Sequence, residues 1–118
     1  MQWYKVDRIG NLEEETILVY GNEPVLFVCT DEEKNKYLVE TIDAFEGNFI
    51  IAQIEDNVLN EMINNKITMY NAFKQSKKLF YTSFDKDYNL KSKVYSSDKI
   101  PDELLPKKDA FLFSSTTR

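Results

Sequence analysis

The stretch "PVLFVCTDEEKNKYLVETIDAFEGNFIIAQI", from Pro24 to Ile54, holds apolar runs separated by short polar segments. Runs rich in β-branched and aromatic residues, bounded by Asp, Asn and Gly, are typical of strands joined by hairpin turns. The runs predict strands over Pro24–Thr30, Tyr37–Ala44 and Phe49–Ile54. Gly47, in the second turn, can adopt a positive φ. Three strands with such short connections form an antiparallel meander.

The apolar pattern differs between these strands. Pro24–Thr30 is apolar at almost every position, which predicts a central strand covered on both faces. The next strand has a polar residue at Glu40, and side chains alternate between the two faces of a strand. Leu38 and Glu40 should therefore lie on one face, and Val39 on the other.

Further strand signals lie on both sides of this stretch. Before it, Glu15–Gly21 is a β-branched run that ends in a Gly-Asn turn signal. After it, Lys78–Phe84 and Leu90–Ser96 flank a polar turn and predict a C-terminal hairpin. We expect one helical turn at Asp102–Leu105 and a last short strand at Ala110–Ser114.

Between the strands the apolar period changes from two to the helical spacing. Asp56 is a suitable N-cap for a first helix, and Asn64 or Asn65 can end it in the left-handed conformation. Thr68 can cap a second short helix. The apolar positions form one stripe, so we expect the pair to cover the sheet rather than to read DNA. The predicted fold is α+β: an antiparallel β-meander with two short helices on one face and a C-terminal hairpin.

The helical region also carries a resemblance. Its spacing Leu-x-x-x-Ile-x-x-x-Ile-[Ser/Thr]-x-x-x-x-Phe is matched by Leu59, Ile63, Ile67, Thr68 and Phe73. With the preceding strands, this pattern resembles small uncharacterised bacterial α+β domains of unknown function, over residues 17–80. The resemblance implies the fold and no activity.

Length and composition set further expectations. The 118 residues, 42% of them hydrophobic, suit a single domain over residues 1–118, with residues 113–118 a frayed tail. One cysteine cannot close an intramolecular disulfide, and no apolar run is long enough for a signal peptide or a membrane span. We therefore expect an acidic, cytoplasmic protein with no membrane partner.

The residue types exclude much catalytic chemistry. The chain has no histidine, which removes histidine bases and histidine metal ligands. Cys29 is expected to be a buried structural thiol. The carboxylate runs Glu13–Glu15 and Asp31–Glu33 are expected in solvated loops, and no glycine-rich phosphate loop is present. We predict no catalytic residues, no metal site and no cofactor.

The charge distribution guides the functional prediction. Residues 1–65 carry a net charge of −10 and residues 66–118 carry +5. We predict a non-enzymatic binding or regulatory module that contacts another protein, with Asp31, Glu32 and Glu33 as possible contact residues. One alternative is a phage or mobile-element inhibitor whose acidic surface imitates nucleic acid. Another is a carboxylate- and metal-dependent enzyme. Nucleic acid is not the expected partner, because arginine is nearly absent.

Overall fold

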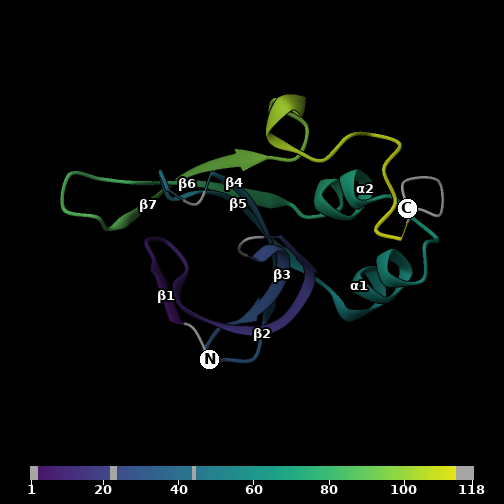
Figure 1. The fold of residues 1–118 in the computed structure, drawn as a ribbon, viewed down its shortest axis with the longest axis horizontal. Helices are drawn as coiled ribbons and strands as arrows, with labels where there is room; N and C mark the ends of the chain where they lie inside the picture. The colour runs from purple at the N-terminus through teal and green to yellow at the C-terminus, as the bar shows by residue number, and fades with distance from the viewer. Residues whose placement is uncertain (1–2, 22–23, 44, 114–118) are drawn as a thin grey trace.

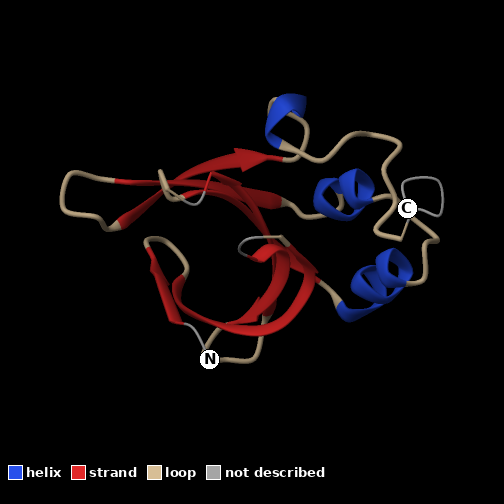
Figure 2. Cartoon of the chain, viewed as in Figure 1, coloured by secondary structure: helices blue, strands red, loops and turns tan. Residues whose placement is uncertain are grey.

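The chain folds into a small barrel with two helices packed on its outside (Figures 1 and 2). The structure, a computed structural model, describes residues 3–21, 24–43 and 45–113. Seven strands follow one another around the barrel in chain order. They are β1 (Trp3–Val6), β2 (Gly10–Tyr20), β3 (Pro24–Thr30), β4 (Lys36–Asp43), β5 (Asn48–Ile54), β6 (Lys78–Phe84) and β7 (Leu90–Ser96).

The prediction of an antiparallel meander is correct for the strand order but did not include closure of the sheet. Consecutive strands pair antiparallel, as expected, but β1 pairs with β7 in parallel at Val6 and Leu90. The sheet is therefore mixed and forms a ring. β1 was missing from the prediction because it is short and its pairing with β7 joins the two ends of the barrel. β2 also begins earlier than the predicted strand at Glu15.

Strand β3 is buried on both faces, as the apolar run Pro24–Thr30 predicted, and the middle of β4 and most of β5 are buried on both faces as well. Phe27 and Cys29 belong to a cluster inside the barrel, whereas Leu26 and Val28 belong to a cluster on its outside. Leu38 and Val39 divide in the same way. Burial of each large apolar side chain contributes about 1.5–3 kcal/mol, so the two clusters supply most of the stabilisation.

The outer cluster is covered by α1 (Asp56–Ile63) and α2 (Met69–Lys74), which confirms two short helices after β5. The Thr68 hydroxyl accepts from the Asn71 N–H at 3.1 Å, as expected for an N-cap. Asn65, between the two helices, has φ 59°, a left-handed conformation that does not continue a helix. The N-cap of α1 is Glu55 rather than the predicted Asp56, and its side chain makes no capping bond.

The C-terminal segment also covers the outer cluster, through Ile100, Leu105 and Leu112. It contains the short 3₁₀ helix η1 (Asp102–Leu104), close to the predicted turn. The prediction of a strand at residues 110–114 is wrong for residues 110–113, which form no strand. Phe113 instead exchanges two hydrogen bonds with the Asn65 side chain, and residues 114–118 lie outside the described chain.

We predict that Phe73→Ala lowers the free energy of unfolding by about 3–5 kcal/mol, measured by urea denaturation. Phe73 is fully buried at the centre of the outer cluster, so truncation leaves a cavity between α2 and the sheet. Phe111→Ala is the control, because that ring is 39% exposed. A loss below about 1 kcal/mol for Phe73→Ala would show that α2 does not depend on this contact.

Candidate interaction surface

The turn between β3 and β4 carries the predicted contact residues Asp31, Glu32 and Glu33. The Asp31 carboxylate accepts from the backbone N–H groups of Glu33 and Asn35, both at 2.9 Å. It also accepts from the Tyr37 hydroxyl at 3.0 Å. Partial burial opposes ionisation of Asp31, but these hydrogen bonds outweigh it and hold its pKa below the ordinary value. Asp31 therefore fixes the shape of the turn.

Glu32 and Glu33 are less engaged. Glu32 accepts from the Asn11 side-chain amide at 2.8 Å, and both glutamates are exposed. No hydrogen bond or ion pair of the Glu33 side chain occurs within the described ranges. The turn thus brings the three acidic residues together, and Asp31 and Glu32 have side-chain partners that Glu33 lacks among the described residues. Their contact with a partner stays a prediction.

We predict that Asp31→Ala lowers the free energy of unfolding by about 1–2 kcal/mol, because several turn donors lose their acceptor. Glu33→Ala, two positions away on the same turn, should change it by less than about 0.5 kcal/mol. Chemical denaturation of both variants compares them. Equal effects would mean that Asp31 is no more structural than its neighbour.

The second acidic run, Glu13–Glu15, does not lie in a loop as predicted but within strand β2. The Glu14 carboxylate accepts from the Tyr4 hydroxyl at 3.2 Å, and Glu15 pairs with Lys36 at 3.7 Å. Strand alternation separates the side chains that a loop would have let converge. Over the residues that the structure describes, no group of three or more potential metal ligands occurs.

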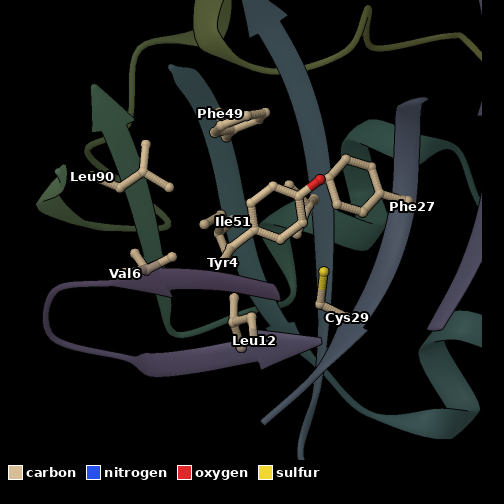
Figure 3. A pocket seen from close by; sticks show the side chains of 9 residues that line it. Tyr4, Val6, Leu12, Phe27, Cys29, Phe49, Ile51 and Leu90 are labelled. Atoms are coloured by element: carbon tan, nitrogen blue, oxygen red, sulfur yellow. The ribbon is translucent and has the colours of Figure 1, made fainter. Parts of the chain in front are cut away.

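The inside of the barrel contains a small apolar cavity of about 10 Å³ (Figure 3). Its walls come from Tyr4, Val6, Leu12, Phe27, Cys29, Val39, Phe49, Ile51 and Leu90. A space of this size holds about one water molecule, and its apolar walls offer water few partners. Burial, followed by the charges of Glu14 and Glu15, raises the pKa of the Cys29 thiol to about 12. Cys29 is thus buried, as predicted, and is not poised as a nucleophile.

Glu40 is the carboxyl group with the most unusual environment among those described. It lies on the outer face of β4 and pairs across the ladders with Leu26 and Ile50, which are both almost fully buried. Burial raises the pKa of Glu40 to about 7. However, Glu40 does not line the barrel cavity, and the structure gives its carboxylate no hydrogen-bonding or ionic partner among the described residues.

We predict that Glu40 makes stability fall as pH rises from about 4.5 to about 7. In this window the folded protein retains the Glu40 proton while the unfolded chain loses it, so the free energy of unfolding falls. Glu40→Gln should remove this fall and stabilise the protein at pH 7.5 by about 1–3 kcal/mol. Urea denaturation from pH 4.5 to 7.5 measures it, with exposed Glu61→Gln as control. Parallel wild-type and Glu40→Gln curves would contradict the prediction.

Several exposed apolar side chains lie in the strand ends and turns at the end of the sheet away from the helices. We call this group the tip surface and define it as Tyr20, Ile42, Phe45, Phe84 and Tyr88. Phe45 is 91% exposed, Tyr88 81% and Tyr20 65%. Figure 1 shows the β6–β7 turn, which carries Tyr88, projecting on the opposite side from α1 and α2. These residues contribute little to either buried cluster.

Backbone pairing brings the tip residues to one level of the sheet. The Phe84 N–H donates to the Glu46 carbonyl at 3.1 Å, which ties the β4–β5 turn to the end of β6. The Phe84 and Tyr88 rings meet edge to face at 6.1 Å. The pairing of Leu26 with Glu40 sets the end of β4 beside the start of β3.

Sequence reasoning placed Phe45 and Tyr88 in two polar turns, and neither was among the predicted protein-contact residues. A signal was nevertheless present, because a large aromatic residue inside an otherwise polar turn has no strand face on which to be buried.

The fold and this surface define a small α+β barrel protein with exposed aromatic turns. No family model, curated protein or solved structure matches the chain. Among the described residues, no helix is long and apolar enough to cross a membrane.

Proposed function

We propose that this protein is a non-enzymatic binding module that works through protein–protein contact, and that the tip surface makes the contact. The observation that carries the proposal is the exposure of Phe45 and Tyr88, at 91% and 81%. Exposed apolar groups of this size, gathered at one end of a domain, are typical of protein interaction sites. Aromatic residues are also the side chains most enriched at the energetic centres of such interfaces.

The backbone at Tyr88 supports the proposal. Tyr88 has φ 62°, a left-handed conformation that is unfavourable by about 1 kcal/mol for a residue with a Cβ atom. Glycine would adopt it without this cost. The ring is largely exposed, so its burial within the fold is too small to offset this conformational cost. A tyrosine held there is better explained by contact with a partner than by stability.

The charges around the tip surface define the partner. Glu46 and Asp87 carry exposed carboxylates in the β4–β5 and β6–β7 turns, and Lys86 is the only cation among the described residues of the turns. The Asp85 carboxylate is engaged by its own turn and lies 3.9 Å from the Lys91 ammonium. The field of the exposed carboxylates favours a partner surface with lysine or arginine around an apolar pocket. The aromatic rings would enter that pocket, and the carboxylates would lie at its rim.

Site-specific photo-crosslinking in the host's cells tests this proposal. A benzophenone side chain at position 45 should give a discrete crosslinked protein, whereas the same group at the exposed position Glu61 on α1 should not. The second substitution Tyr88→Gly should reduce the position-45 product by about tenfold, the effect expected for a central aromatic contact. Equal crosslinking from positions 45 and 61, or none from position 45, would overturn the proposal.

We predict that Tyr88→Gly does not destabilise the protein, although it removes a large side chain. Relief of the left-handed conformation is worth about 0.5–1 kcal/mol and offsets the lost ring contact with Phe84. Lys34→Gly is the matched control, because Lys34 has φ 71° in an equivalent turn and is not part of the tip surface. Thermal unfolding measures both. A loss above about 1.5 kcal/mol for Tyr88→Gly would mean that Tyr88 serves the fold.

The nucleic-acid-mimicking alternative is less supported. Of the acidic residues in β2 and the β3–β4 turn, Glu14, Glu15 and Asp31 already have partners within the protein. A mimic needs a row of free charges, and its binding should weaken steeply with salt. Partner binding that falls steeply with salt, yet is unchanged by Tyr88→Gly, would favour it.

A further inference from the structure

We propose that the free edge of β7 binds an extended segment of another protein as an added strand. The segment would carry acidic side chains on one face and apolar side chains on the other. This inference concerns a surface separate from the tip surface and does not depend on it.

The edge exists because β1 covers only the beginning of β7. All seven residues of β7 pair with β6, but β1 pairs with β7 only at Leu90. Asp7 extends this contact: its N–H donates to the Leu90 carbonyl, and its side chain accepts from the Ser92 N–H. The chain then turns away at residues 7–9 into β2. Beyond Ser92, β7 has a strand neighbour on one side only among the residues that the structure describes.

The same contacts establish which backbone groups face this edge. In an antiparallel ladder, alternate residues direct both their N–H and C=O groups to the partner strand or away from it. The Leu90 carbonyl and the Ser92 N–H point toward β1, and the β6–β7 register has no shift. The N–H and C=O of Val94 must therefore point away from β6. Neither has a hydrogen-bond partner among the described residues. The Ser96 N–H points the same way.

Side chains along this edge have two different faces. Leu90 lies in the interior cluster and Tyr95 contacts the outer cluster, so Val94 lies on the interior side with Leu90. Val94 is nevertheless 38% exposed, because no strand continues the barrel wall beside it. An added strand would place an apolar side chain next to Val94 and complete that wall.

The outer face of this edge is basic, so it favours acidic side chains on the same face of the bound segment. Lys91 and Lys93 are exposed there, and the Lys93 ammonium lies 5.2 Å from the centre of the Tyr95 ring. Acidic residues on the added strand would lie beside these lysines, where opposite charges on neighbouring strands are favourable. Pairing of two β7 edges would instead bring lysines together, so a second copy of this chain is not the occupant.

Amide hydrogen exchange with a designed peptide tests the proposal. The probe is a capped heptapeptide that alternates Glu and Val, a pattern that fits either strand direction. In the free protein the Val94 and Ser96 amides should exchange quickly, whereas those of Lys93 and Tyr95, which bond to β6, should be slow. With the peptide at millimolar concentration, exchange of the Val94 and Ser96 amides should slow by about tenfold or more.

Variants test the two parts of the recognition separately. Val94→Pro removes the free N–H without removing a bond to β6, so it should abolish peptide protection at Ser96. The pair Lys91→Glu and Lys93→Glu should weaken the Glu–Val peptide about tenfold and favour a Lys–Val peptide instead. Lys107→Glu, at an exposed position outside the sheet, is the charge control. If Val94→Pro does not fold, the charge exchange still tests the proposal.

Several results would overturn the inference. These are a slowly exchanging Val94 amide in the free protein, no protection by the Glu–Val peptide, or equal protection by the Glu–Val and Lys–Val peptides. Protection by a single-stranded oligonucleotide but not by the peptide would assign the lysines to nucleic acid and also overturn it. Tyr88→Gly should leave the peptide effect unchanged, so failure here does not bear on the tip surface.

Discussion

The architecture depends on the single place where the sheet closes. Val6 of β1 pairs with Leu90 of the neighbouring strand β7. The Asp7 carboxylate accepts from the Ser92 N–H, and the Asp7 backbone carbonyl accepts from the Ser92 hydroxyl at 3.0 Å. Asp7 and Ser92 lie 85 positions apart in the sequence. A contact of such separation carries a large loop-closure cost if made early, so we expect it to form after the intervening hairpins. The same closure makes an interior possible, because without β1 the interior cluster would lose Tyr4 and Val6.

The closed ring gives the central strands two separate cores. The interior cluster is narrow and filled by side chains, with a cavity of only about 10 Å³. The outer cluster is covered by short helices and a C-terminal segment with little regular structure. Helices of eight and six residues are too short to be stable in isolation, so their stability derives from Phe73, Leu59 and similar contacts with the sheet. Ile63 and Ile67, on the same helical stripe, are only half-buried at its margin.

Local sequence patterns predicted much of the fold, whereas contacts between distant parts of the chain were not predicted. The bounds of β3, β6 and β7 agree with the apolar runs, and Gly47 and Asn65 adopt the positive φ expected of them. Ring closure could not be predicted, because it depends on which distant strands meet. The position of the β3–β4 turn was predicted correctly, but its role as a contact site stays a prediction, and the tip surface was not predicted. The role of Asp31 as the acceptor for that turn was missed, since an acidic triplet does not show which carboxylate faces the backbone.

Comparison of two turns separates what the fold requires from what it leaves open. "DEEKN" and "DKDYN" are built alike: Asp31 and Asp85 each accept from the backbone N–H groups two and four residues later. In each turn the fourth residue is left-handed, Lys34 in one and Tyr88 in the other. The hydrogen bonds account for the aspartates but place no demand on the fourth side chain, where glycine would be least strained. The same backbone thus presents a lysine near the helices and an aromatic ring at the far end. The turn geometry therefore accounts for the two aspartates and for the left-handed backbone, but not for the choice of tyrosine at position 88.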